Sequence, residues 1–234
     1  MPGVLLKACL NGARSPREHP ALPVTAAQLA ADAAACVAAG AGAIHLHPRG
    51  GDGRESLEAA VIDPVVARVR AACRVPVGVA TGAWVEPDPE RRAALVAAWR
   101  EPDFASVNLS EEGAPGVMRA LLAAGIGVEA GVWSPEDAER LAATGPADRL
   151  TRVLVEVMEG GVAEAQAIEV ALDELGIRGP RVLHGEEAAC WPVLAYARST
   201  GRDTRIGLED TLALPDGTPA PSNEALVRAA LALG

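Results

Sequence analysis

The chain carries the run AIHLHPRGG at residues 43–51, a short apolar segment that ends in a loop rich in proline and glycine. The apolar part predicts a buried β-strand over residues 43–47. Side chains two positions apart lie on the same face of a strand, so His45 and His47 point in the same direction at its end. Two imidazoles placed in this way provide half of a metal site, although an H-x-H pattern also occurs where both histidines are only hydrogen-bonded structural residues.

A second run of the same character is TRIGLED at residues 204–210. It predicts another buried strand, which ends in the carboxylates of Glu209 and Asp210. A carboxylate oxygen would complete a three-ligand site with His45 and His47. The fold must place these two distant strand ends together for such a site to form.

Short apolar runs alternate with alanine-rich amphipathic segments about eight times along the chain. Alternation at this spacing predicts parallel strands, and eight units predict an α/β fold closed into a (β/α)8 TIM barrel. We expect a single domain over residues 1–234. The expected strands are 4–10, 43–47, 75–80, 104–108, 126–131, 152–157, 181–184 and 204–208, and the expected helices are 25–39, 63–72, 89–99, 114–124, 134–143, 162–175, 187–199 and 222–233.

A doubly wound open sheet is the alternative architecture. That fold favours a G-x-G-x-x-G turn after its first strand. Here the first strand leads into a long loop over residues 11–24 that lacks the motif. The barrel is therefore the preferred prediction.

Composition limits the possible partners and the cellular compartment. Half of the residues are hydrophobic but only 3% are aromatic, which suits small aliphatic side chains packed between helices and a parallel sheet. The net charge of −10 argues against nucleic acid or an anionic membrane as the main partner. No apolar run is long enough to span a membrane or resembles a signal peptide, and the four cysteines show no paired spacing. We expect a cytoplasmic protein with reduced thiols.

Barrel closure brings the two motif strands close together. The last strand of a closed barrel lies beside the first, and the first lies beside the second. Glu209 is then one strand away from His45 and His47. Two neutral imidazoles and one carboxylate leave coordination positions open, as in catalytic zinc sites, where an open position polarises a substrate oxygen.

Further motifs follow in a fixed order. The chain reads NGA at 11–13, LPVT at 22–25, HLHxR at 45–49, TG at 81–82, SxN at 106–108, RxGxED at 205–210 and SN at 222–223. Over nearly its whole length the chain resembles the β-keto acid cleavage enzymes. The combination of HLHxR with RxGxED is more specific than either motif alone.

The resemblance implies a zinc-dependent barrel that exchanges acyl groups between a β-keto acid and acetyl-CoA. Condensation followed by retro-Claisen cleavage would give acetoacetate and a new acyl-CoA. The implied Zn2+ ligands are His45, His47 and Glu209. The implied catalytic residues are Asp210, Arg205 and Glu129, with Asp210 as the acid/base candidate, and the implied substrate contacts are Arg14, Thr81, Ser106, Asn108 and Arg49.

The physical chemistry of a β-keto acid agrees with these roles. Its two oxygens can chelate one cation, and the enolate formed during carbon–carbon bond making or breaking needs its negative charge stabilised. A guanidinium inside a barrel, as expected for Arg205, requires a charged partner. A purely structural ion pair is the alternative role for Arg205.

Two positions depart from the family pattern. Relatives carry a second acidic residue two positions after the Glu129 equivalent, where this chain has Gly131. Arg14 replaces an acidic residue after the Gly-Ala pair. An arginine would repel a substrate ammonium and attract an anion, which predicts a neutral substrate or a β-keto dicarboxylic acid. Alternatively, Arg14 is solvated or binds the phosphates of coenzyme A.

Two other functions remain open from sequence. One is a different zinc-assisted reaction on the same barrel, such as hydrolysis or decarboxylation of a keto acid. The other is a non-catalytic binder of a metal or metabolite, which the loss of a carboxylate at Gly131 would explain. Dependence on acetyl-CoA separates the first alternative from acyl transfer, and any turnover excludes the second.

Three tryptophans near expected loops bear on assembly. Trp84, Trp99 and Trp191 would be poorly accommodated if exposed on a monomer, and together with the family resemblance they predict a homo-oligomer, specifically a tetramer. Alternatively, these side chains cover the ends of the barrel itself.

Overall fold

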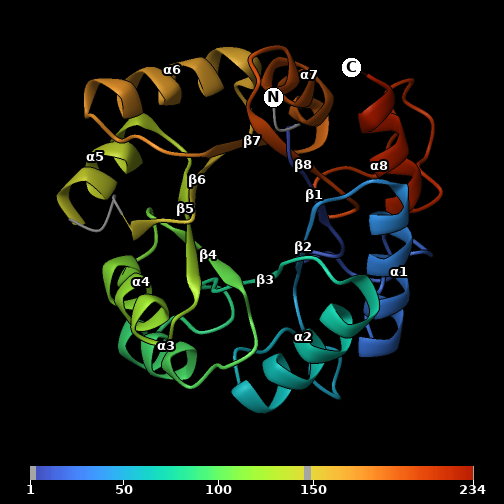
Figure 1. The fold of residues 1–234 in the computed structure, drawn as a ribbon, viewed down its shortest axis with the longest axis horizontal. Helices are drawn as coiled ribbons and strands as arrows, with labels where there is room; N and C mark the ends of the chain where they lie inside the picture. Colours follow the sequence, from blue (N-terminus) through green and yellow to red (C-terminus); the bar gives the residue numbers. More distant parts are fainter. Residues whose placement is uncertain (1–3, 145–148, 234) are drawn as a thin grey trace.

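A computed structural model describes residues 4–144 and 149–233, which form a closed barrel of eight parallel strands in the order β1 to β8 (Figure 1). The strands are β1 (Leu6–Cys9), β2 (Ala43–Leu46), β3 (Val77–Ala80), β4 (Phe104–Asn108), β5 (Gly127–Val132), β6 (Arg152–Val157), β7 (Arg181–Gly185) and β8 (Asp203–Ile206). The helices are α1 (Ala26–Ala39), α2 (Ala59–Cys73), α3 (Pro89–Ala97), α4 (Ala114–Ala123), α5 (Pro135–Thr144), α6 (Gly161–Glu174), η2 (Glu187–Ala189), α7 (Cys190–Ser199) and α8 (Asn223–Ala232). The predicted (β/α)8 barrel is confirmed.

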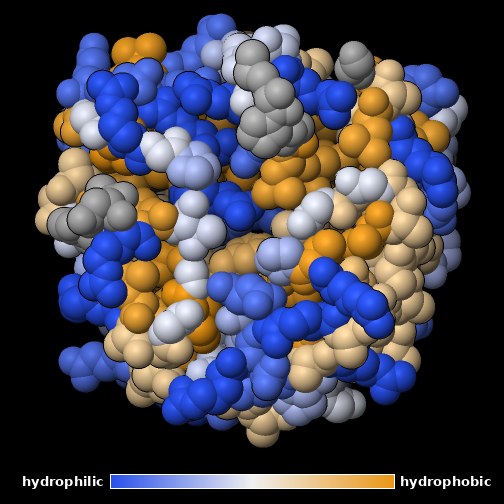
Figure 2. Space-filling model, in the orientation of Figure 1, coloured by the Kyte–Doolittle hydropathy of each residue, from blue (hydrophilic) through white to orange (hydrophobic). Residues whose placement is uncertain are grey.

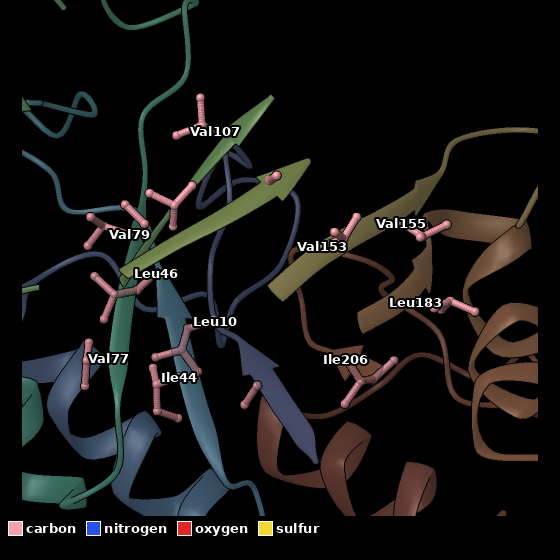
Figure 3. Close-up of a cluster of buried hydrophobic side chains, with 14 of the residues drawn as sticks. Leu10, Ile44, Leu46, Val77, Val79, Val107, Val153, Val155, Leu183 and Ile206 are labelled. Atoms are coloured by element: carbon pink, nitrogen blue, oxygen red, sulfur yellow. The ribbon is translucent and has the colours of Figure 1, made fainter. Parts of the chain in front are cut away.

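Strand alternation separates two kinds of buried surface. On β2, Ile44 and Leu46 belong to the hydrophobic core, while the intervening His45 faces the barrel axis. Figure 3 shows Ile44 and Leu46 in one cluster with aliphatic side chains from the other strands, such as Val79 and Val155. Aliphatic residues thus join the sheet to the helices, and many of the side chains that face the barrel interior are polar or charged.

Charged side chains fill the deep interior of the barrel. Lys7 forms an ion pair with Glu129, and Arg152 Nη1 lies 3.3 Å from Glu129 Oε1. Lys7 and Arg152 also lie over the ring of Phe104, at 5.5 and 5.6 Å from its centroid. Gly78 leaves the space for that ring, since a Cβ there would lie 2.0 Å from Phe104 Cε2.

Local sequence explains how the helices begin and where the predictions were wrong. Thr25 caps α1 in a capping box with Gln28, as its position predicts. Helix α2 begins one turn earlier than expected. The prediction began the helix at residue 63 and so placed Pro64 in the first turn, where proline is tolerated, but the structure has Pro64 inside the helix. The expected helix over 187–199 is divided, with the short η2 turn before α7. The other boundaries agree with the predictions within two residues.

The surface is mixed in polarity, and the three tryptophans differ in how exposed they are. Figure 2 shows hydrophilic and apolar residues interspersed over one end of the barrel. Trp84 is 53% exposed, Trp191 is partly buried, and Trp99 is fully buried with Nε1 donating to the carbonyl of Leu57 at 2.8 Å. The expectation that Trp99 is exposed is therefore wrong, because its indole finds a partner inside the molecule. Within the described ranges, no helix has the length and apolar character needed to cross a membrane.

Candidate active site

Three side chains meet where β2 and β8 end. His45 Nε2 lies 3.7 Å from Glu209 Oε1, and His47 Nε2 lies 3.8 Å from Glu209 Oε2. One ligand atom from each residue can be chosen so that all three lie within 4.8 Å of one another. Because ligand atoms lie about 2.0 to 2.2 Å from a zinc ion, this spacing fits three ligands around one metal.

The environment of His47 orients its ring toward the cluster. His47 Nδ1 lies 2.8 Å from Glu55 Oε2, so Nε2 is directed at Glu209. Trp84 stacks on the His47 ring, with 6.1 Å between centroids, and donates from Nε1 to the same Glu55 oxygen at 3.2 Å. A carboxylate that fixes a histidine ring in this way is common behind metal ligands.

The pKa values of the two histidines are shifted in opposite directions. Burial holds the pKa of His45 well below its ordinary value, and the neighbouring His47 lowers it further. Burial alone would also lower the pKa of His47, but the carboxylates of Glu209 and Glu55 outweigh it and raise the pKa. His45 is thus neutral, as a metal ligand must be.

An unsatisfied carboxylate oxygen also points to a cation. Among the described residues, Glu209 Oε2 is buried without a hydrogen-bond partner, and it lies 3.8 Å from His47 Nε2. Buried polar atoms are usually paired, so an unpaired carboxylate oxygen beside imidazoles fits a site that holds a positive ion. The residues present therefore fit a zinc ion.

Two asparagines hold the ligand-bearing strand ends together. The Asn11 side chain accepts from the His47 backbone N–H and donates to the His47 carbonyl, both at 2.9 Å. Asn223 Oδ1 accepts from the backbone N–H of Leu208 at 2.6 Å, and its Nδ2 donates to the carbonyl of Leu10 at 2.8 Å. These bonds explain why asparagine follows strand β1 and why α8 begins with Ser-Asn.

A second polar group extends from β8 to β6. Arg205 donates to Asp210 Oδ1 from Nε at 3.0 Å and from Nη2 at 2.7 Å, and its Nη2 also lies 3.0 Å from Glu209 Oε1. His184 Nδ1 lies 3.5 Å from Asp210 Oδ1, and its Nε2 lies 3.2 Å from Glu156 Oε2. The four side chains from Arg205 to Glu156 form a continuous polar chain beside the metal cluster.

The cluster opens into a cavity of about 410 Å3 at the ends of the strands. The sequence-predicted residues on its wall are Arg14, His45, His47, Thr81, Ser106, Asn108, Arg205 and Glu209. The structure thus brings most of the candidate site residues to one cavity. Parallel strands converge in this way at the active face of (β/α)8 enzymes.

Three of the expected site residues do not line the cavity. Glu129 is fully buried and paired with Lys7 and Arg152, so it lies beneath the cavity and its expected catalytic role has no geometric support. Arg49 donates to the backbone carbonyls of Gly12 and Arg14 and so supports the loop after β1 without lining the cavity. Asp210 is fully buried behind Arg205 and also does not line the cavity.

Several residues of the site carried no clear sequence signal. Glu55 and Trp84 lie in loops after β2 and β3, and Trp133 follows β5. Glu187 pairs with Arg14 across the cavity mouth and has a φ of 46°, which is strained for a residue with a side chain. This conformation of Glu187 is visible only in the structure.

Fold and site together define a (β/α)8 barrel with a candidate catalytic metal centre at its strand ends. The model of the beta-keto acid cleavage enzyme family matches residues 3–234. The chain belongs to this family. The family is named for the cleavage of β-keto acids, and the resemblance found in the sequence motifs is confirmed.

Solved structures similar to this chain include two complexes of ObcA. A binary complex of ObcA with oxaloacetate has a TM-score of 0.65 at 16% identity, and a ternary complex with a C4-CoA adduct and oxalate has 0.64 at 16%. Each comparison covers 89% of this chain and 62% of the ObcA chain, so this chain spans less than two thirds of ObcA. Type I 3-dehydroquinate dehydratase from Clostridium difficile has a TM-score of 0.65 at 12% identity, covering 99% of this chain and 92% of that one. At identities this low, the comparisons show that the fold is shared and nothing more.

Proposed function

We propose that this protein is a zinc-dependent β-keto acid:acetyl-CoA acyltransferase of the retro-Claisen type. It would condense a β-keto acid with acetyl-CoA and release acetoacetate and a new acyl-CoA. The observation that carries the proposal is the cluster of His45, His47 and Glu209 at the cavity of a barrel from this family. The catalytic and binding roles below belong to the same proposal.

Zinc held by these three residues would supply positive charge for the two oxygens of a β-keto carboxylate and for the charge of its enolate. Arg205 contributes a second, permanent positive charge on the cavity wall. Burial opposes that charge, but Asp210 together with Cys9, Glu209 and Glu156 outweighs burial and raises the pKa of Arg205 well above its ordinary value. Asp210 then acts through Arg205, holding the guanidinium in place from behind.

The part of the cavity wall that β3 and β4 form supplies polar groups without a net charge. Ser106 and Asn108 line the cavity from β4, and the Thr81 hydroxyl donates to the Ser106 carbonyl at 2.7 Å. We assign these residues to the substrate's carboxylate and keto oxygens. The ObcA complexes with oxaloacetate and with a CoA adduct support a small keto acid and a coenzyme A thioester as the partners of this site.

The test is a panel of β-keto acids incubated with acetyl-CoA, with acetoacetate as the measured product and a chelator as the control. Acetoacetate that forms only with acetyl-CoA and disappears with the chelator is the expected result. Consumption of the keto acid without acetyl-CoA would instead identify a hydrolase or decarboxylase. No turnover of any keto acid would leave a metal or metabolite binder.

The charge of the substrate provides a separate prediction. Arg14 lines the cavity and pairs with Glu187, whose side chain is 61% exposed, and with Glu18 at 3.4 Å. A carboxylate at the far end of the substrate can displace so exposed a partner and form a bidentate pair with Arg14. We therefore expect the wild type to prefer a β-keto dicarboxylic acid over an amino-bearing analogue, and Arg14→Glu to invert that order in kcat/KM.

Two results would show that Arg14 does not bind the substrate. An equal loss of kcat/KM on both substrates would make Arg14 a support for the loop, since its Nε also donates to the Glu209 carbonyl at 3.2 Å. A raised KM for acetyl-CoA alone would place Arg14 at the coenzyme.

Assembly and location remain proposals. The homotetramer is supported by family membership and by the 53% exposure of Trp84, while the buried Trp99 no longer supports it. We also retain the proposals of one domain over residues 1–234 and of a cytoplasmic location. The four cysteines are free and buried, in agreement with reduced thiols.

A further inference from the structure

His184 and Glu156 are buried ionisable side chains that nothing in the proposed function uses. They are 1% and 6% exposed, and they are paired in register on the neighbouring strands β7 and β6. His184 Nε2 lies 3.2 Å from Glu156 Oε2, and His184 Nδ1 lies 3.5 Å from Asp210 Oδ1. One imidazole thus lies between two buried carboxylates.

Charges of opposite sign alternate along this part of the barrel. Arg205 donates twice to Asp210 Oδ1, and its Nη2 lies 3.0 Å from Glu209 Oε1. Burial and the charge of Arg205 would lower the pKa of His184, but Asp210 and Glu156 outweigh them and raise the pKa. The imidazolium form is therefore favoured, and the order Glu156, His184, Asp210, Arg205, Glu209 alternates in sign. Buried charges persist only when each has such a partner.

Two buried carboxylates compete for the Arg205 guanidinium. It binds Asp210, which does not line the cavity, whereas Glu156 does line it. Burial alone would raise the pKa of Glu156, but His184 and the charge of Arg205 outweigh it and lower the pKa. Within the described part of the chain, His184 is the one ion-pair partner of Glu156. Without that positive charge, the unpaired carboxylate would attract the guanidinium away from Asp210.

Gly131 on β5 makes room for the Glu156 carboxylate. A Cβ added to Gly131 would lie 2.7 Å from Glu156 Oε1 and 2.7 Å from Asn108 Oδ1, which is closer than such contacts occur. Any side chain at 131 would therefore move the carboxylate or the amide. Position 131 lacks the carboxylate of the family pattern, and Glu156 places one in the same space from the neighbouring strand β6.

We propose that His184 is a positioning residue for Arg205 and that Glu156 in turn holds His184. The imidazolium neutralises Glu156 and pairs with Asp210, so the guanidinium stays on Asp210 with its Nη2 beside Glu209 at the cavity wall. The inference rests on the proposed function, in which Arg205 supplies a permanent positive charge to the substrate. The position of that charge, and not the presence of an arginine alone, then sets the rate.

The first experiment is the His184→Gln variant of the zinc-loaded protein. Glutamine retains hydrogen-bonding atoms but removes the positive charge between the two carboxylates. A misplacement of about 1 Å can cost about 100-fold in rate, so kcat for acetoacetate formation should fall by about 10- to 100-fold. The bound zinc and the KM for acetyl-CoA should stay close to wild type, because no ligand residue changes.

A second substitution should restore the balance of charge and, with it, activity. Adding Glu156→Gln to His184→Gln removes the carboxylate that has lost its partner. The guanidinium can then return to Asp210, so the double variant should exceed His184→Gln in melting temperature and, by about tenfold, in kcat. A purely structural His184 predicts the opposite result, because a second buried substitution beside the first would damage the packing further.

The matched control is Glu159→Gln, which makes the same change of charge at an exposed carboxylate three residues after Glu156. Alone, it should remain within about twofold of wild type in kcat. Added to His184→Gln, it should restore neither kcat nor the melting temperature, because it leaves the buried Glu156 without a partner.

The position of Arg205 can also be measured without turnover. Its Nε–H donates to Asp210 Oδ1 at 3.0 Å inside the protein, so proton NMR should show a signal protected from solvent exchange. The signal is assigned by its absence in Arg205→Lys. We expect His184→Gln to lose this protection and the double variant with Glu156→Gln to recover it.

The remaining outcomes each overturn one of the two proposals. If wild type turns over no β-keto acid, the proposed function fails, and the Arg205 Nε–H signal alone decides whether His184 holds the guanidinium. If wild type is active and His184→Gln keeps its kcat or that signal, His184 does not act through Arg205. If the double variant fails to recover kcat, His184 serves the packing of the barrel and the inference is overturned.

Discussion

Replacing His47 by alanine should remove both the bound zinc and the activity while the barrel stays folded. His47 supplies one of the three atoms that lie within 4.8 Å of one another, and a site with two remaining ligands no longer holds the ion. The fold should persist because the hydrophobic core lies between strands and helices, away from the cavity. Zinc content by elemental analysis, acetoacetate formation and circular dichroism measure the three effects.

Two control variants show whether the loss of zinc is specific to the ligand residues. His19→Ala removes a buried histidine whose Nε2 lies 2.7 Å from the Ala220 carbonyl, away from the cluster, and should keep its zinc. Glu55→Gln keeps all three ligands but weakens the support of the His47 ring, and should lower zinc affinity by about 10- to 100-fold. A His45→Ala/His47→Ala double variant that kept its full zinc content would overturn the ligand assignment.

The candidate metal cluster followed from two regularities of the sequence. The period of two in a strand aligned His45 with His47, and closure of the barrel placed β1 between β8 and β2. Neither step needed side-chain detail. The alternation of apolar and amphipathic segments likewise defined the barrel, because each strand and each helix must bury one face.

Depth inside the barrel was not accessible from sequence. Glu129 pairs in register with Arg152, four residues before Glu156 on β6. Four residues of a strand span roughly 13 Å, so Glu129 lies well below Glu156 along the barrel axis. The stagger between strands decides which inward-facing carboxylate reaches the cavity, and a single sequence carries no signal for that stagger.

Contacts between distant loops were equally hidden. Arg49 belongs to the HLHxR motif, yet its guanidinium binds carbonyls of the loop after β1. Lys7 interrupts an apolar strand because Glu129, 122 residues away, pairs with it inside the barrel. In both cases the partner is set by the three-dimensional fold, so the residue type alone suggested a role without locating it.

Replacing Gly207 by alanine should destabilise the barrel and weaken zinc binding together. Gly207 follows β8 immediately, and a Cβ there would lie 1.8 Å from the backbone oxygen of Cys9 and 3.0 Å from Asn223 Oδ1. Neither a strand carbonyl nor the asparagine that ties Leu208 to Leu10 can move freely. The end of β8 must shift away from β1, at a cost of about 3 kcal/mol or more for so severe an overlap.

That shift acts directly on the candidate metal centre. Glu209 is two residues beyond Gly207, and its backbone N–H approaches the same Cys9 oxygen at 3.4 Å. Displacing it separates the carboxylate from His45 and His47 without changing any ligand. A loss of 3 kcal/mol corresponds to a melting temperature about 6 to 12 °C lower in a chain of this size. We expect zinc affinity to fall by about tenfold or more.

The matched control is Gly116→Ala in helix α4. A Cβ there would meet only the flexible end of Arg119, at 3.9 Å, and the backbone is helical. Alanine inside a helix is favoured over glycine by about 1 kcal/mol, so this variant should be as stable as wild type or more so. Thermal unfolding and zinc titration of both variants provide the comparison. If Gly207→Ala matched Gly116→Ala in melting temperature and zinc affinity, the close approach of β8 to β1 would not be what positions Glu209.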